Sequence, residues 1–485
     1  MDFPSDTLAA NESTAPARGM LFVCALLLVY AGALAWLGRS FTSASMDAEA
    51  AAFWLVSFSV PAALVYLFEL RSSTPKSPTK MAIPWIIATG FAMRAIVMTA
   101  PPSLEDDYYR YLWDGAVTAH RLNPYHYSPT QVLWGSIGAE PVPPAFMQLA
   151  EEAGPILERI NHPDLTTIYP PIAQRSFAMA HWFTPWSTDS WRCVLLLADV
   201  VTLKILLRLL SVLGLPSMAI AWYWWNPLLL RETYGGAHMD VLTLPFVMGA
   251  VLLATKKRFT LSMLVLALAG GVKLWPIMLV PILLRPTFAT PKRLFLALGV
   301  FLATTALVWS PAVSRAFGAN SGFLAYAASW QYNAGAFALL EGLCRHVLAR
   351  IGHQHVQWAG PLARGVVGAV LLAWVVWLIR KPVIDDRDVS RRCCLALAAL
   401  FLLAPAQFPW YFVWLLPFLT IAPSVALLSY SLLLPLYYVH LWHPAIAWLE
   451  HGAVWLLLAR EIATGRIAQR RVRPVGSLPC LEQGP

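Results

Sequence analysis

The chain has 485 residues, of which 58% are hydrophobic and 13% are charged, and its formal net charge is +9. Soluble domains carry about 25% charged residues, so the composition excludes an ordinary soluble enzyme and a disordered or fibrous protein. Apolar runs of about 20 residues recur along the chain, the length that crosses a bilayer as a helix. We therefore expect an all-α polytopic membrane protein whose excess positive charge lies in cytoplasmic loops. Six cysteines without regular spacing indicate neither a disulfide framework nor a zinc site.

The first part of the chain predicts three spans and a long outer loop. Apolar runs cover residues 19–38, 51–70 and 81–100, and the Ser-, Pro- and Lys-rich stretch 71–80 lacks acids, which places it in the cytoplasm. Residues 101–170 then lie outside and form the longest polar stretch. Within it we expect short amphipathic helices over 106–120 and 144–160, lying along the outer membrane surface.

The remainder predicts further helices, giving a bundle of about 12 or 13 crossings. The apolar runs are residues 191–210, 218–230, 241–254, 261–284, 294–309, 361–379, 393–404, 411–421, 425–441 and 446–459, with partial helices over 170–185 and 333–350. Basic residues at both ends of 261–284 and a Gly-Gly pair in its middle favour a hairpin of two half-helices, with Lys273 near its outer tip.

This pattern divides the chain into three regions. Residues 1–80 hold two N-terminal transmembrane helices, 81–420 form the core with the outer loop 101–170, and 421–485 hold the last helices and a basic cytoplasmic tail. Both ends are expected in the cytoplasm. Arg94 and Asp199, inside predicted helices, are expected to pair with neighbours.

The strongest chemical signal is the segment Glu105–Gly115, just beyond the third span. Asp106 and Asp107 are adjacent carboxylates near a low-dielectric boundary, where the pKa of a carboxyl is raised towards that of a useful general base. Tyr109 and Arg110 follow, and an arginine binds phosphate well. A plain helix start, where Asp is also favoured, is the alternative.

The other unusual polar residues map to the same outer face by charge parity. Lys273 lies in an apolar hairpin and needs an anionic partner, either a phosphate or a side chain such as Asp240. The aromatic residues among these candidates would be explained equally well by a belt of rings at the membrane interface. The pair His238 and Asp240, two residues apart, supplies too few ligands for a metal site. The further candidates for substrate contact are Asn123, Tyr169, Gln174, Arg175, His238, Asp240 and Trp410.

Taken together, these motifs resemble the GT-C glycosyltransferases, in particular glycosyltransferase family 87. The resemblance rests on the Asp-Asp-x-Tyr-Arg-Tyr-Leu-Trp-Asp-Gly motif at 106–115 and the Asn-Pro-Tyr at 123–125, followed in order by 169–171, 226–240, 273–276 and 409–411. It covers about residues 94–417. Glu105 departs from the family pattern, in which Ser commonly precedes the Asp pair. The two helices before residue 81 look like an addition to the core.

The resemblance implies transfer of a sugar, most commonly mannose, from a polyprenyl-phosphate donor to a hydroxyl acceptor, with inversion. The acceptor is a glycan, lipid or protein, the site faces the periplasm of the bacterial cytoplasmic membrane, and nucleic acid is not a partner. No cofactor is expected, since cations suffice for a monophosphate, although metal dependence stays open.

The same resemblance assigns roles to residues. Asp107, or else Asp106, would be the base, with Arg110, Arg175 and Lys273 binding the phosphate. His238, Asp240, Tyr109, Asn123, Tyr169, Gln174 and Trp410 would contact substrate.

A transporter or lipid flippase is the rival class. It would share the many helices and the intramembrane charges. Such proteins are often built from two related halves, and here the long outer loop occurs once. Adjacent carboxylates at a loop–helix junction are also not a requirement of transport.

Overall fold

The structure is a computed structural model that describes residues 18–43, 45–72, 82–137, 140–313 and 320–464. Helices dominate these ranges, and the single sheet found in them is a two-residue antiparallel pair, β1 (Ser136–Ile137) with β2 (Glu140–Pro141). The all-α prediction is confirmed. The basic tail after residue 464 and most of the stretch 71–80 lie outside the described residues.

The elements follow the predicted runs closely. Up to residue 224 they are α1 (Arg18–Thr42), α2 (Ala48–Ser72), α3 (Ala82–Met98), α4 (Asp107–Ala119), α5 (Pro129–Trp134), α6 (Pro144–Ala153), η1 (Gly154–Arg159), α7 (Pro171–Phe183), α8 (Thr188–Val212), η2 (Ser217–Ile220) and α9 (Ala221–Trp224). Next come α10 (Pro227–Leu230), η3 (Arg231–Gly235), η4 (Met239–Thr243), α11 (Leu244–Thr255), α12 (Phe259–Gly270), η5 (Trp275–Leu279), α13 (Val280–Leu284), η6 (Arg285–Thr287) and α14 (Pro291–Val313). The last are α15 (Gly322–Ser329), α16 (Gly335–Ile351), η7 (His353–Trp358), α17 (Ala359–Arg380), α18 (Asp386–Leu403), η8 (Pro409–Trp414), α19 (Leu416–Leu419), α20 (Val425–Leu433), η9 (Leu434–Leu436), α21 (Tyr437–His440) and α22 (Ala445–Ala463).

Several helices have the length and apolarity of membrane spans. In the described ranges three qualify singly, Gly19–Thr42, Pro291–Val313 and His353–Arg380, and a pair bent by 105°, Pro227–Gly235 with Met239–Thr255, makes a fourth if it is one broken span. Five shorter apolar helices accompany them, Ala48–Leu64, Ile83–Met98, Phe259–Gly270, Trp275–Thr287 and Val425–His440. The chain is a polytopic membrane protein, while the count of 12 or 13 crossings stays a prediction.

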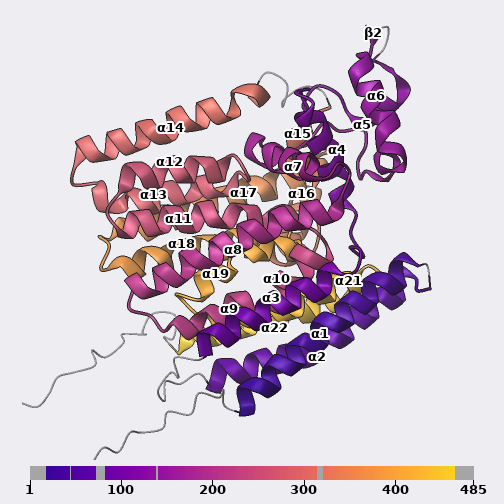
Figure 1. Ribbon diagram of the computed structural model, residues 1–485. Coiled ribbons are helices and arrows are strands. Elements are labelled where there is room, and N and C mark those ends of the chain that lie inside the picture. Colours follow the sequence, from indigo (N-terminus) through magenta and orange to yellow (C-terminus); the bar gives the residue numbers. More distant parts are fainter. Residues whose placement is uncertain (1–17, 44, 73–81, 138–139, 314–319, 465–485) are drawn as a thin grey trace, which may run out of the picture.

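The helices pack side by side, with the polar loop elements gathered at one end of the bundle. In Figure 1, α8, α11, α12 and α14 form one stack, and α1, α2 and α3 lie together on the other side. The labels of α4, α7, α15 and α16 cluster at one end, and α5, α6 and β2 project beyond it.

The helix α4 is largely buried against the rest of the protein. Nine of its residues are buried, and it packs along α7. A Cβ on Gly115 would lie 2.6 Å from the Phe177 carbonyl oxygen, so glycine permits this close approach. Polar groups on this helix satisfy one another: Arg110 Nε donates to Asp114 Oδ1 at 3.0 Å. The place of α4 along the outer membrane surface stays a prediction.

The chain between α12 and α13 reverses at the Gly-Gly pair, as expected. Both η5 and α13 pack back against α12. The Gly271 carbonyl accepts the backbone N–H of Ile172 at 2.8 Å, in the first turn of α7. A Cβ on Gly271 would lie 2.5 Å from Ile172 Cγ1 and 2.7 Å from Val308 Cγ1. The reversal is therefore fixed by α7, and it brings Lys273 beside that helix.

An internal ion pair joins α3 to α8. Arg94 Nε lies 2.8 Å from Asp199 Oδ2, and the two side chains are 1% and 0% exposed. The hydroxyls of Tyr223 and Tyr234 donate to Asp199 at 2.6 and 2.7 Å. The Arg94 guanidinium also lies 3.4 Å from the centre of the Trp224 ring. The expected pairing of Arg94 and Asp199 with neighbours is confirmed.

Candidate active site

Three carboxylates surround one buried imidazole at the start of α4. His238 Nδ1 lies 3.8 Å from Asp107 Oδ2, and its Nε2 lies 3.9 Å from Glu105 Oε2 and 3.7 Å from Glu232 Oε2. The His238 side chain is 1% exposed, and that of Asp107 is 28% exposed. A loop, a helix start and a bent helix pair thus bring four titratable groups together.

A bend between two helical segments places His238 in this cluster. The helix bends by 105° between η3 and η4, and Ala237 has a positive φ of 58°. Trp191 Nε1 donates a hydrogen bond to the Ala237 carbonyl at 2.8 Å. A Cβ on Gly236 would lie 2.9 Å from His238 Cδ2 and 3.0 Å from Arg231 Nη1, so only glycine leaves room for both side chains.

Lys273 forms the cationic side of the site. Its Nζ lies 3.1 Å from Asp240 Oδ1, and the Lys273 side chain is 16% exposed. Trp414 Nε1 donates to the same oxygen at 2.8 Å. The ammonium also lies 4.5 Å from the centre of the Tyr411 ring, a favourable cation–π distance. Asp240 is thus the side-chain partner that the sequence offered as an alternative to a phosphate.

An aromatic segment, η8, closes the cluster from the far end of the chain. Trp410 stacks on His238 with ring centres 3.8 Å apart and planes inclined by 12°. The loop before η8 is held by a parallel bridge between Tyr332 and Ala406, in which the Tyr332 carbonyl accepts the Gln407 N–H at 2.9 Å. Trp410 and the carboxylate binder Trp414 are therefore placed by contacts outside the outer loop.

Burial perturbs the acids that lie outside the membrane spans. Burial, reinforced by the charges of Asp106 and Asp240, raises the pKa of Asp107 to about 6, against the opposing effect of Lys273. Burial and the charges of Asp107 and Glu232 raise the pKa of Glu105 well above its usual value. A carboxyl with a pKa near 6 is ionised at neutral pH and is a stronger base than an ordinary aspartate.

Asp106 and Asp107 face different surroundings. Asp106 precedes α4 and accepts a hydrogen bond from Asn161 Nδ2. It lines a cavity of about 470 Å³ that Asp107 does not line. Adjacent residues at a helix start point about 100° apart, which accounts for the separation.

Several other predicted site residues take part in the framework. Gln174 Nε2 donates to Asp114 Oδ2 at 3.0 Å and to the Tyr169 carbonyl at 3.3 Å. Arg110 binds Asp114 and, through both terminal nitrogens, the Leu165 carbonyl at 3.1 Å. These contacts join α4 and α7 to the loop between them. The Arg110 guanidinium is therefore occupied by Asp114 and Leu165.

The remaining predicted residues lie around the outer loop. Asn123 Oδ1 accepts the Tyr125 N–H at 2.9 Å. Tyr109 accepts a hydrogen bond from Arg159 Nη1 at 2.6 Å. Arg175 is exposed on α7 and makes no ion pair or hydrogen bond with the residues that the structure describes.

Sequence reasoning included Glu105, Arg231 and Glu232 in its polar clusters without assigning them a role, and it did not single out Trp414. Arg231 and Glu232 are ionisable residues inside an apolar run, a pattern that marks functional sites by default. Glu232 Oε2 accepts from the Tyr438 hydroxyl at 2.9 Å. No local signal in the sequence points to Trp414, because its partner Asp240 lies 174 residues away.

The cluster leaves an unusual number of buried polar atoms without a hydrogen-bond partner. They are His238 Nδ1 and Nε2, Asp240 Oδ2, Glu232 Oε1, Arg231 Nε and Nη1, and Trp275 Nε1. More than about 90% of buried polar groups in proteins are hydrogen-bonded. Their concentration around His238 makes this cluster the candidate for binding polar groups of a substrate. Among the described residues no three His, Cys, Asp or Glu side chains are grouped to hold a metal ion.

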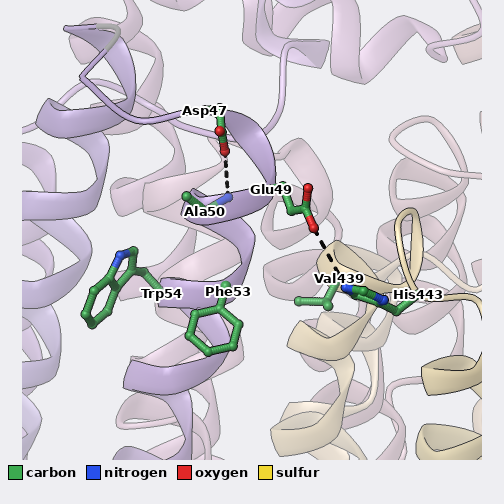
Figure 2. Close-up of a pocket in the computed structure, with 7 residues that line it drawn as sticks. All are labelled: Asp47, Glu49, Ala50, Phe53, Trp54, Val439 and His443. Carbon is green, nitrogen blue, oxygen red and sulfur yellow. Dashed lines mark hydrogen bonds and ion pairs between the residues drawn. The ribbon is translucent and has the colours of Figure 1, made fainter.

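A second hollow lies between the start of α2 and the end of α21. Figure 2 shows the Glu49 carboxylate directed towards His443, and these two side chains are 3.7 Å apart and more than half exposed. Asp47 Oδ1 accepts the Ala50 N–H at 2.8 Å and begins the helix. None of the residues lining this hollow belongs to the His238 cluster.

Comparison with known proteins identifies the family. Residues 22–287 match the family described as "Alpha-(1->6)-mannopyranosyltransferase, N-terminal domain". A relative from Corynebacterium glutamicum, named "Alpha-(1->6)-mannopyranosyltransferase A", is 24% identical over 392 residues, covering 71% of this chain and 72% of the relative. A relative of the same name from Mycobacterium tuberculosis is 24% identical over 365 residues, covering 67% and 64%.

The helical membrane fold and these matches define the class, a membrane glycosyltransferase. Because the matched residues cover more than half of its length, the chain belongs to the alpha-(1->6)-mannopyranosyltransferase family. The predicted kinship with GT-C mannosyltransferases is thereby confirmed, and the enzyme is a mannosyltransferase with a sugar donor and a glycan acceptor.

Proposed function

We propose that this mannosyltransferase moves mannose from a polyprenyl-phosphate donor to a hydroxyl of a mannose-containing glycan, with inversion. The reaction takes place on the outer face of the bacterial cytoplasmic membrane. The printed names of the relatives favour the 6-hydroxyl as the acceptor and an α linkage as the product. The main support is the group of unpartnered buried polar atoms around His238, beside a basic carboxylate and a lysine.

Asp107 acts as the general base in this proposal. Its carboxylate takes the proton of the acceptor hydroxyl, while that oxygen attacks the anomeric carbon. The bond between this carbon and the phosphate oxygen breaks, and the phosphate leaves with the bonding electrons. The pKa of Asp107, about 6, suits proton transfer near neutrality.

Two cations stabilise the leaving phosphate. Lys273 is partly exposed, and its ammonium group is held beside Asp240. Arg231 has two buried nitrogens without partners, and its guanidinium lies against the position of Gly236 together with His238. Preorganised cations act most strongly where charge develops in a water-poor site. Arg231 therefore replaces Arg110 as the second phosphate binder, since Arg110 is engaged by Asp114, whereas the exposed Arg175 stays a candidate for a phosphate at the site's rim.

His238 and Asp240 contact the sugar, and Trp410 supplies an aromatic wall behind the imidazole. Tyr109, Asn123, Tyr169 and Gln174 shape the outer loop that covers the site. No cofactor is needed for this step, because the donor is already activated.

The test is sugar transfer by the purified full chain in proteoliposomes, from polyprenyl-phosphate mannose to α-(1→6)-mannobiose. Asp107→Asn keeps the size of the side chain but not the base, so the rate should fall by about 10²–10⁴. Asp106→Asn is the matched control on the neighbouring residue, and it should retain most of kcat at saturating acceptor. Loss confined to Asp106→Asn would exchange the two roles. Near-normal transfer in both variants would refute the carboxylate mechanism.

A further inference from the structure

A cavity of about 470 Å³ lies beside the cluster and has no role so far. It is open to the surface and is bordered by the end of α1, the start of α4, the turn η1 and the start of α8. Its walls include Thr42, Glu105, Asp106, Tyr109, Arg159 and Trp186. This volume falls in the range of about 300–1,000 Å³ that is typical of sites for small molecules.

The chemistry of the walls favours a neutral polyol over an anion. Glu105 and Asp106 supply two carboxylates, and the lining cation Arg159 already donates to the Tyr109 hydroxyl at 2.6 Å. Such a surface repels phosphate but accepts hydrogen bonds from hydroxyls. Tyr109 and Trp186 add aromatic faces with polar edges, which suit the mixed surface of a sugar ring.

Glu105 connects this cavity with the His238 cluster. Its side chain lines the cavity, and its Oε2 lies 3.9 Å from His238 Nε2. Asp107 approaches the other nitrogen of the same imidazole, at 3.8 Å. Lys273, by contrast, is held at Asp240 and does not line the cavity. The cavity thus reaches the Nε2 side of His238 through Glu105, whereas Lys273 lies at Asp240, outside the cavity.

We infer that this cavity binds the acceptor saccharide, while the donor phosphate binds on the Lys273 side. The inference rests on the proposed function and adds to it the binding site of the second substrate. Each substrate then meets walls of the appropriate charge, and the acceptor hydroxyl reaches Asp107 past Glu105.

The experiment fills the cavity. Thr42→Trp places a large ring at its wall, and Ser43→Trp is the matched control one residue on, outside the cavity. The two hydroxyls are equivalent locally, since Thr42 donates to the Gly38 carbonyl at 2.9 Å and Ser43 to the Ser40 carbonyl at 3.1 Å. Tryptophan is well tolerated at the end of a membrane helix.

Titration calorimetry with α-(1→6)-mannobiose measures binding directly, without turnover. Thr42→Trp should raise the Kd, and the KM for this acceptor, by about tenfold or more, with the KM for the donor unchanged; Ser43→Trp should match the wild type. Asp106→Asn, which does not alter volume, is a second variant that should raise the Kd by about threefold to tenfold, each tenfold being about 1.4 kcal/mol.

Each result decides between the alternatives. Mannobiose binding that is unchanged in both Thr42→Trp and Asp106→Asn would overturn the inference, as would a cavity that binds inorganic phosphate instead. Binding that Thr42→Trp weakens, in a protein that transfers no mannose, would keep the cavity and reject the proposed function. Normal mannose transfer in both variants would keep the proposed function and reject the cavity as the acceptor site.

Discussion

Two groups of buried charges in this protein differ in how completely their polar atoms are used. In the Arg94–Asp199 pair, both Asp199 oxygens accept hydrogen bonds, and Arg94 also donates to the Gly90 and Trp224 carbonyls. Its one unbonded nitrogen, Nη2, belongs to a guanidinium that lies over the Trp224 ring. Around His238, by contrast, both imidazole nitrogens and an oxygen of Asp240 have no partner. The polar atoms of the first group are thus almost all hydrogen-bonded within the protein, whereas several in the second are not.

The contrast predicts that breaking the first group mainly affects folding. Arg94→Met should lower the free energy of unfolding by about 3–5 kcal/mol, because Asp199 is left as a buried, unpaired charge. Thermal unfolding in detergent measures this loss. The double variant Arg94→Met with Asp199→Asn removes both charges and should regain much of the stability. An Arg94→Met protein that is as stable as the wild type would show that the two groups do not differ in this way.

Breaking the second group should affect chemistry more than stability. Lys273→Met should reduce kcat by about 10²–10³, the usual cost of losing one donor to a developing negative charge. Asp240 keeps the Trp414 hydrogen bond in this variant, which limits the loss of stability. The assay is transfer from polyprenyl-phosphate mannose at matched amounts of folded protein. Unchanged turnover would remove Lys273 from the mechanism.

The pH profile sharpens the electrostatic part of the comparison. A base with a pKa of about 6 is protonated below that value, so kcat/KM should rise about tenfold per pH unit up to about pH 6 and then level off. Asp106 raises the pKa of Asp107 and Lys273 lowers it. The midpoint should therefore move to lower pH in Asp106→Asn and to higher pH in Lys273→Met. Shifts in the same direction would contradict Asp107 as the titrating base.

The exposed pair Glu49–His443 is the control for both groups (Figure 2). Exposed ion pairs contribute about 0.2–1 kcal/mol, because water and salt screen the charges. Glu49→Gln should accordingly change the melting temperature by about a degree or two and leave transfer unaffected. A large loss of activity in this variant would mean that the site extends much further than the His238 cluster.

The sequence predicted most helices and much of the candidate site, for a physical reason. Ionisable residues are costly in apolar runs, so His238, Asp240 and Lys273 were conspicuous, and charge parity placed them on one face with Asp107. The structure brings these four together. The pairing of Arg110 with Asp114, four residues later on the same helix, follows from their spacing but was not among the predictions, and it competes with any phosphate. The separation of Asp106 from Asp107 was not predictable, because it depends on the residue at which α4 begins.

The aromatic segment η8 has a consequence for how such enzymes diversify. The family match ends at residue 287, yet Trp410 and Trp414 come from beyond it and contact His238 and Asp240. Recombination after residue 287 would retain the acids and the lysine while exchanging the aromatic rings that contact His238 and Asp240. The aromatic wall of the cluster and its charged groups are thus encoded in separate stretches of one gene, and a chimaera joined near residue 287 would take them from different parents.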